Sequence, residues 1–172
     1  KRQPEDNYGR SKSEAEIQLL QLTDETGMEV VIIRPPLVYG PGVKANFSAL
    51  MRLVMKGLPL PLASINTNKR SLVSVTNLVD LIITCIDHPM AANQLFLVSD
   101  DNDISTSEMV KLMAKSLNVR TFQWHFPLSG YRLLGKVTGK SDAIERLIGS
   151  LQVDITHTKD RLDWTPPISI EE

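Results

Sequence analysis

The sequence predicts an α/β fold that contains a buried parallel sheet, and three observations predict it. A helical segment at residues 7–25 ends near Gly27 and leads into a continuous apolar run at residues 30–33. A second short apolar run, residues 94–98, follows another helical segment at 76–87. Uninterrupted apolar runs are typical of parallel strands that are covered on both faces. Helices that alternate with such strands are the pattern of an α/β sheet.

The first helix has recognisable ends. Asp6 or Asn7 can cap its N-terminus, and Gly27 follows its last turn, a position where glycine is common. Its apolar residues make a broad face instead of a narrow stripe: Ala15, Ile17, Leu19, Leu20 and Leu22. After the strand at 30–33, the prolines and glycines of residues 35–42 predict a loop. Ligands of open parallel sheets bind beyond the carboxyl ends of the strands, where this loop is expected.

The middle of the chain predicts two more helices. Residues 46–55 form an amphipathic segment that ends near Gly57. Thr76 or Asn77 is expected to cap the next helix, which runs to about residue 87.

The last third of the chain predicts shorter elements. Residues 99–103 are acidic and predict a turn, and Ser105 and Glu108 then have the spacing of a capping box. The helix that they begin reaches about Leu117, and a short strand is expected at residues 121–126. Two further helical segments follow, at residues 127–138 and 141–150.

Composition and charge limit the class of protein. Nineteen basic and twenty acidic residues give a net charge of -1, which suggests no bulk attraction to nucleic acid or to an anionic membrane. No apolar run approaches the roughly 18–20 residues of a membrane-spanning helix. Cys85 is the only cysteine, so no internal disulfide can form, and a reducing, cytoplasmic location fits. His125 and His157 lack a partner at metal-ligand spacing, so no metal site is predicted.

Tyr8 and Lys12 are the candidate catalytic pair. They are four residues apart, so they project from one face of the first helix, about one turn apart. An ammonium group beside a tyrosine favours the phenolate and lowers its pKa from a reference of about 10. A tyrosine with a pKa nearer neutrality can exchange a proton with a substrate hydroxyl. The spacing alone also fits an ordinary solvated pair.

Three segments in the same order carry a family resemblance. The helix with the Tyr8–Lys12 pair is followed by a buried strand and by Arg-Pro-x-x-Val-Tyr-Gly-Pro-Gly at residues 34–42. Residues 70–78 and residues 154–172 supply the second and third matches. Together they resemble the extended short-chain dehydrogenase/reductase family, and within it the NAD-dependent nucleotide-sugar epimerases and dehydratases.

The resemblance implies a fold and a division of the chain. It implies the C-terminal part of a Rossmann-type doubly wound sheet, together with a small mixed α/β substrate domain. Residues of about 7–42 and 76–100 would complete the sheet, and about 43–75 and 118–172 would contribute to the substrate domain. The sequence contains no Gly-x-Gly-x-x-Gly or Gly-x-x-Gly-x-x-Gly turn for a dinucleotide. The chain is therefore expected to be the C-terminal portion of a longer enzyme, and to be inactive alone.

The resemblance also implies roles at the nicotinamide side of NAD. Tyr8 and Lys12 match the catalytic tyrosine and lysine of the family, and both would also contact the cofactor. Pro35 and Leu37, which follow the buried strand, would line the nicotinamide pocket. The third catalytic residue, a serine or threonine before the tyrosine, would lie upstream of Lys1.

Substrate contacts are implied at two positions. Asn46 and Arg70 would lie near the diphosphate of a sugar nucleotide, and a guanidinium fork suits phosphate oxygens. From the local sequence alone, Arg70 also fits a solvated basic turn. Two acids of the family pattern are replaced here by Ser71 and Asn77, which puts the fine placement of substrate in doubt.

The reaction favoured by the resemblance is C4 epimerisation of a UDP-hexose or UDP-N-acetylhexosamine through a transient 4-keto sugar. A 4,6-dehydratase and a 4-ketoreductase share the same motifs and stay open as alternatives. A non-catalytic sugar-nucleotide-binding module is the alternative from another functional class. The resemblance also implies that the full-length enzyme is a homodimer.

Overall fold

The computed structural model describes residues 7–42 and 46–170. The predicted cap at Asp6 lies outside the described residues, as do the side chains of Asn7, Tyr8 and Asn46. The helices are α1 (Asn7–Thr26), α2 (Asn46–Met55), α3 (Val75–Asp87), α4 (Thr106–Ser116), α5 (Leu128–Thr138), α6 (Ser141–Ile148) and α7 (Thr156–Leu162). The strands are β1 (Ile32–Arg34), β2 (Leu37–Tyr39), β3 (Leu72–Ser74) and β4 (Leu95–Leu97).

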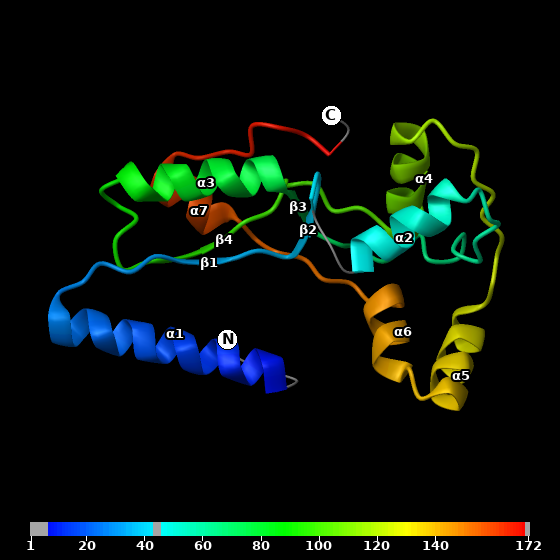
Figure 1. Ribbon diagram of the computed structural model, residues 1–172, viewed down its shortest axis with the longest axis horizontal. Helices are drawn as coiled ribbons and strands as arrows, with labels where there is room; N and C mark the ends of the chain where they lie inside the picture. The colour runs from blue at the N-terminus through cyan, green and yellow to red at the C-terminus, as the bar shows by residue number, and fades with distance from the viewer. Residues whose placement is uncertain (1–6, 43–45, 171–172) are drawn as a thin grey trace.

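The strands form two parallel pairs. β1 pairs with β4, with Ile32 opposite Leu95, and β2 pairs with β3, with Leu37 opposite Leu72. Figure 1 shows α1 and α3 on opposite sides of β1 and β4. The prediction of an α/β fold with covered parallel strands is therefore confirmed.

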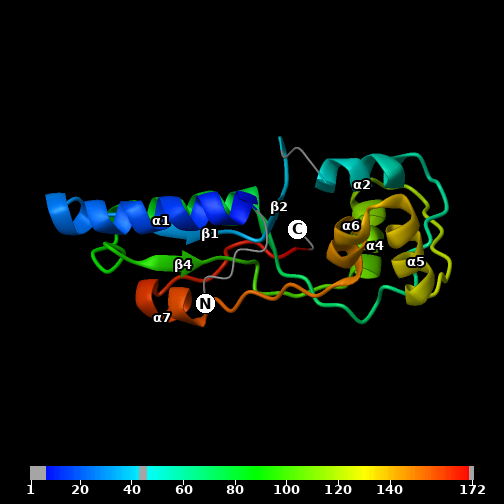
Figure 2. The ribbon, with the colours of Figure 1, turned by 90° about the horizontal axis from the view of Figure 1, so that it is seen from below.

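Two hydrophobic clusters hold the chain together. The first joins α2, α4, α5 and α6, with members that include Phe47, Val54, Ile65, Val110, Tyr131 and Ile148. The second surrounds β1, β4, α3 and α7, with members that include Leu81, Phe96, Val98, Leu162 and Trp164. Figures 1 and 2 show the helices of the first cluster at one end of the molecule's long axis and β1 and β4 toward the other.

One helix cap agrees with the sequence prediction and another differs from it. Ser105 caps α4 as predicted, because its hydroxyl accepts a 3.1 Å hydrogen bond from the backbone N–H of Glu108. The prediction that Thr76 or Asn77 caps α3 is wrong. Ser74 is the cap, and its hydroxyl accepts a 3.0 Å bond from the backbone N–H of Asn77. The difference arises because β3 runs directly into α3, so the last residue of the strand is also the helix cap.

Two other segments differ from their predicted form. Residues 35–42, predicted as a loop, contain the short strand β2. Residues 121–126, predicted as a strand, form only one bridge, in which Gln123 faces Leu60. The segment opposite leaves the extended form directly after Leu60, where a turn occupies residues 61–64, so the ladder does not continue.

Within the described part of the chain, no helix combines the length and the apolar character that crossing a bilayer requires.

Candidate active site

The N-terminal end of α1 lies beside the carboxyl ends of the strands. Figures 1 and 2 both place this end of α1 level with β2 and with the end of β1 along the molecule's long axis. Tyr8 and Lys12 belong to this end of the helix. The structure therefore brings the segment of the predicted catalytic pair to the edge of the sheet where open α/β folds bind ligands.

Arg34 at the end of β1 anchors this helix. Its Nε donates a 2.8 Å hydrogen bond to Oε1 of Glu16, and its Nη2 contacts Oε2 in a second charge-assisted bond. The hydrogen bond with Glu16 raises the pKa of Arg34. A bidentate pair of this kind fixes direction as well as distance.

The anchor and the predicted catalytic pair share one stripe of α1. Tyr8, Lys12 and Glu16 are spaced four residues apart, so they follow one another along the same side of the helix. By holding Glu16, Arg34 sets the rotation of that side relative to the sheet. Glu16 was not among the predicted site residues, although its i+4 spacing from Lys12 was a signal that could have found it.

The two residues predicted at the nicotinamide pocket follow directly from β1. Pro35 is exposed, and Leu37 is half-buried in β2, opposite Leu72. Leu37 also packs against the first hydrophobic cluster, which leaves little freedom for its backbone.

Arg70 is held by its backbone and by its side chain. Its N–H donates to the carbonyl of Ile104 at 2.9 Å, and Ile104 donates back at 3.1 Å. Nη1 of Arg70 donates to the carbonyl of Arg146 and, at 3.4 Å, to that of Gly149, at the C-terminal end of α6. Burial lowers the pKa of Arg70. The interpretation of Lys69–Arg70 as a solvated basic turn does not describe this half-buried side chain.

A carboxylate lies beside Ser71, which replaces the first acid of the family pattern. The hydroxyl of Ser71 donates a 2.5 Å hydrogen bond to Oδ1 of Asp103, and Gln152 donates to Oδ2 at 2.6 Å. The Ser71 oxygen also accepts a 2.8 Å bond from the N–H of Val153. Asp103 thus supplies a negative charge next to the position where the family pattern has an aspartate.

Asn77, which replaces the second acid of the family pattern, also lies beside a carboxylate. Nδ2 of Asn77 donates to Oδ1 of Asp100 at 2.6 Å, and the N–H of Ser74 donates to the same oxygen at 3.0 Å. Asn77 also exchanges two hydrogen bonds with the backbone of Ile168, at 2.8 and 3.1 Å.

Burial, and then the adjacent Asp100 carboxylate, raise the pKa of Tyr39. Tyr39 is therefore a poor proton acceptor, in contrast to the role predicted for Tyr8.

These two carboxylates belong to the acidic turn that follows β4. From the sequence, residues 99–103 were predicted only as a turn. The missed signal was that acidic residues directly follow a buried strand, at the sheet edge where β3 also ends. In the folded chain, Ser71 and Asn77 each hydrogen-bond to a carboxylate of this turn, Ser71 to Asp103 and Asn77 to Asp100.

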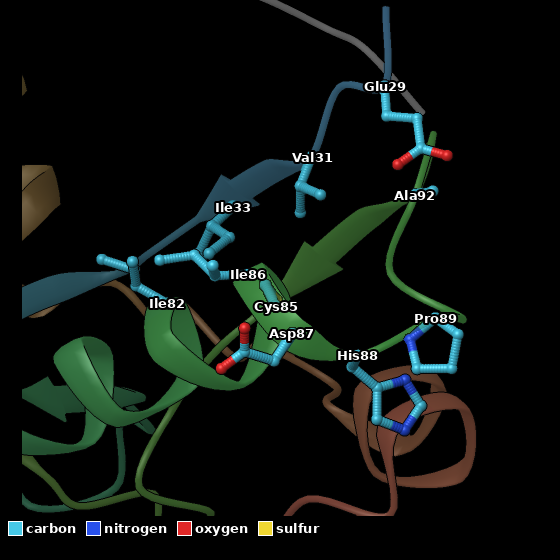
Figure 3. A pocket seen from close by; sticks show the side chains of 10 residues that line it. All are labelled: Glu29, Val31, Ile33, Ile82, Cys85, Ile86, Asp87, His88, Pro89 and Ala92. Atoms are coloured by element: carbon cyan, nitrogen blue, oxygen red, sulfur yellow. The ribbon is translucent and has the colours of Figure 1, made fainter.

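The surface also has a hollow beside β1. It has a volume of about 600 Å³ and lies between β1 and α3. Figure 3 shows Ile33 beside Ile82 and Ile86, with Asp87 and His88 at the end of α3. Its lining combines apolar side chains with the polar groups of Glu29, Asp87 and His88.

Comparisons with known proteins agree with this geometry. A sequence model of the "NAD dependent epimerase/dehydratase family" matches residues 1–98. The chain is 63% identical over 169 residues to a UDP-glucose 4-epimerase from Vibrio cholerae, covering 98% of this chain and 52% of that protein. It is 28% identical over 150 residues to an N-acetyl-α-D-glucosaminyl-diphospho-ditrans,octacis-undecaprenol 4-epimerase from Escherichia coli O157:H7, covering 82% and 45%.

A solved structure shows the same fold. The UDP-N-acetylglucosamine 4-epimerase from Bacillus cereus superposes with a TM-score of 0.74 at 14% identity, covering 98% of this chain and 52% of that one. The chain spans about half the length of the curated relatives it matches. Because the family model matches more than half of its residues, the chain belongs to the NAD dependent epimerase/dehydratase family.

Proposed function

We propose that the full-length protein is an NAD-dependent nucleotide-sugar 4-epimerase. Its substrate would be a UDP-hexose or UDP-N-acetylhexosamine, interconverted through a transient 4-keto sugar. The observation that carries the proposal is the stripe of α1 that presents Tyr8 and Lys12, held at the sheet edge by the pair between Arg34 and Glu16. The 63% identity to a UDP-glucose 4-epimerase supports the choice within the family.

In this proposal Tyr8 is the acid–base residue. Its phenolate takes the proton of the sugar hydroxyl at C4 and returns it after the sugar has turned over in the site. Lys12, one helical turn away, favours the phenolate electrostatically and lowers the pKa of Tyr8. Lys12 would also hold the nicotinamide ribose.

The residues at the end of β1 fit the nicotinamide side of NAD. Pro35 is exposed directly after β1, and Leu37 is half-buried at the start of β2, opposite Leu72. NAD would supply the hydride acceptor and donor of the reaction. The protein's own contribution is to hold the sugar, to exclude water and to move one proton.

Arg70 and Asn46 are proposed to hold the diphosphate. A guanidinium group has five N–H donors, and the two bonds of Arg70 described above use the single nitrogen Nη1. The remaining donors suit phosphate oxygens, which guanidinium binds in pairs. Asn46 begins α2, where an amide side chain and the first backbone N–H groups favour an anion.

The remaining parts of the proposal concern the whole protein. The second cluster, around β1 and β4, would belong to the nucleotide-binding sheet, and the first cluster to the substrate domain. A cytoplasmic location agrees with the single cysteine, and the homodimer rests on the family resemblance alone. A 4,6-dehydratase, a 4-ketoreductase and a non-catalytic binding module stay as alternatives.

A second candidate substrate is a diphosphate sugar that carries a polyprenyl lipid in place of the nucleoside. The name of the E. coli relative describes such a substrate. The observation that favours it here is the exposed apolar surface of α5, where Leu133 is 64% and Val137 is 78% exposed. The Tyr8 and Lys12 chemistry would be the same for either substrate.

The test is a product analysis with the full-length protein. UDP-glucose, UDP-galactose, their N-acetyl forms and an N-acetylglucosaminyl-diphospho-polyprenol are incubated separately without added reductant, and the sugars are followed by NMR. An equilibrium mixture of C4 epimers from a UDP-sugar supports the first proposal. Epimers from the lipid-linked sugar alone support the second candidate. A keto-deoxy product, or turnover only with added NAD(P)H, replaces epimerase by dehydratase or reductase.

A further inference from the structure

The outward face of α5 is apolar. Tyr131 and Gly135 form the buried face of this helix, against the first hydrophobic cluster. Leu133 and Val137, which are four residues apart, lie on the opposite side and are 64% and 78% exposed. Leu134 beside them is 51% exposed. A surface helix of a globular protein normally carries polar residues there.

The core does not need these exposed side chains. The inner face of α5 is already filled, because Tyr131 packs edge-to-face against Phe126 with ring centroids 4.9 Å apart. Gly135 lies close enough to α6 that an added Cβ would meet Ile144 at 3.0 Å. Leu133 and Val137 therefore have no packing role in this helix pair.

The segment that contains α5 has an excess of basic residues. Residues 119–150 contain five basic side chains, Arg120, Arg132, Lys136, Lys140 and Arg146, and two acidic ones, Asp142 and Glu145. Five minus two gives a local charge of +3, in a chain whose overall net charge is -1. Arg132 pairs with Glu145 at 3.2 Å, whereas Lys136 lies on α5 itself, between Leu133 and Val137 in sequence.

We propose that the outward face of α5 rests on the surface of an anionic phospholipid bilayer. Leu133 and Val137 would enter the boundary between head groups and acyl chains, and Lys136 and Lys140 would contact the phosphates. An apolar face flanked by lysine and arginine is the pattern of a helix that lies in the membrane interface. Juxtaposed basic residues strengthen attraction to anionic lipids.

Trp124 adds an exposed aromatic side chain near α5. Its ring is 42% exposed and packs edge-to-face against Phe126, which contacts α5 through Tyr131. Indole rings favour the membrane–water interface, where one edge is apolar and the other is hydrated. The overall charge gave no reason to expect a membrane partner, and the local distribution of charge and apolar surface gives one.

A comparison within the chain shows that apolar exposure alone does not decide the partner. Ile83 and Ile86 on α3 are 57% and 75% exposed, as much as the α5 pair. The charged residues of α3 are Asp80 and Asp87, and the helix has no basic residue. An anionic bilayer would repel this face. Figures 1 and 2 place α5 at the end of the molecule remote from β1 and β4, whereas Figure 1 shows α3 lying along them.

The test is vesicle flotation of the full-length protein. Vesicles of phosphatidylglycerol and phosphatidylcholine are compared with vesicles of phosphatidylcholine alone. Binding is expected to the anionic vesicles and to weaken with added salt. Leu133→Ser/Val137→Ser and, separately, Lys136→Gln/Lys140→Gln are each expected to lower the partition coefficient about tenfold or more. Ile83→Ser/Ile86→Ser is the matched control and should bind like the unaltered protein.

The outcomes separate the proposal from its competitors. Circular dichroism checks that each variant folds. If the Leu133→Ser/Val137→Ser variant does not fold, the vesicle binding of the Lys136→Gln/Lys140→Gln variant tests the proposal. Absence of binding to anionic vesicles, or equal loss in the α3 control, overturns the proposal. It is also overturned if the α5 variants change the oligomeric state by light scattering without changing vesicle binding, because the face then joins two copies of the chain. The measurement needs no substrate, so its result is independent of the proposed reaction.

Discussion

Nδ2 of Asn77 donates a 2.6 Å hydrogen bond to Oδ1 of Asp100, and both side chains are buried. The pair joins the N-terminus of α3 to the turn after β4. Through Ile168 it also fastens the C-terminal segment to the same point. A buried carboxylate is costly unless hydrogen bonds satisfy it, so the amide of Asn77 is part of what stabilises Asp100.

The first prediction concerns this pair. Asn77→Asp places a second carboxylate against Asp100 and should lower the free energy of unfolding by about 3 kcal/mol. The exchanged variant Asn77→Asp/Asp100→Asn restores one carboxylate and one amide, and should recover part of that loss. Recovery is incomplete because a carboxylate at position 77 could no longer donate to the carbonyl of Ile168. Urea denaturation measures all three proteins, with the exposed Asn66→Asp as control.

If Asn77→Asp costs no more than Asn66→Asp, the carboxylate at 100 does not interact with position 77 as described. If the exchanged variant is less stable than Asn77→Asp, the two positions are not a matched pair.

The sequence could predict what depends on neighbours along the chain. It predicted α1, α4 with its Ser105 cap, and the two buried strands that pair as β1 and β4. These elements follow from apolar periodicity and from a cap three residues away from its partner. The strand β2 was missed because its three residues lie among prolines and glycines, and only the pairing with β3 makes them a strand.

The sequence could not predict what depends on contacts made by folding. Asp100 and Asp103 act on residues 23 and 32 positions earlier in the chain, and no local pattern links them. Arg70 and the end of α6 are joined across 76 residues. Tyr8 and Lys12 were singled out from their four-residue spacing together with the family resemblance, whereas the pair between Arg34 and Glu16 joins two different elements.

The second prediction concerns pH. The pKa of Tyr39 is raised in the folded protein, by burial and then by Asp100. The folded state therefore retains the Tyr39 proton at a pH where the unfolded chain, with a tyrosine pKa of about 10, has released it. The stabilisation is complete below about pH 10 and is lost as the pH rises beyond that value toward the folded-state pKa. The melting temperature should fall more steeply above about pH 10 in the unaltered protein than in Tyr39→Phe.

Phenolate absorbance gives an independent check on the same groups. Burial also raises the pKa of Tyr131, so Tyr39 and Tyr131 should both titrate above the ordinary range. Tyr39→Phe should remove one late-titrating tyrosine from the absorbance curve. A curve whose late phase is unchanged would contradict the environment described for Tyr39.

The third prediction concerns the anchor of α1. Glu16→Gln keeps the size of the side chain but removes the charge that Arg34 holds in two bonds. Because α1 is then free to rotate, turnover should fall by roughly tenfold or more, with the melting temperature little changed. Glu14→Gln is the control, since Glu14 is exposed on the same helix and outside the stripe of Tyr8, Lys12 and Glu16. If the two variants are equally active, the pair between Arg34 and Glu16 does not position the catalytic residues.

The fourth prediction concerns Arg70, which is proposed both to bind phosphate and to close the end of α6. Arg70→Lys keeps the positive charge but loses the planar fork that can serve both partners at once. UDP affinity should fall about tenfold, and stability should fall by about 1–2 kcal/mol because the carbonyls of Arg146 and Gly149 lose the guanidinium Nη1 that donates to both. Isothermal titration with UDP and urea denaturation measure the two effects separately. Loss of stability with unchanged UDP affinity would limit Arg70 to the structural role.

The last prediction concerns Tyr8. Tyr8→Phe removes the hydroxyl that the proposed reaction uses, while the ring keeps its shape on α1. Turnover of the UDP-sugar should fall by a factor of about a thousand or more, because general acid–base catalysis contributes on the order of 10²–10⁴. UDP-sugar affinity should stay within about twofold, since the diphosphate contacts are proposed for Arg70 and Asn46. Unchanged turnover in Tyr8→Phe would remove Tyr8 from the mechanism, and a loss of affinity equal to the loss of rate would make it a binding residue.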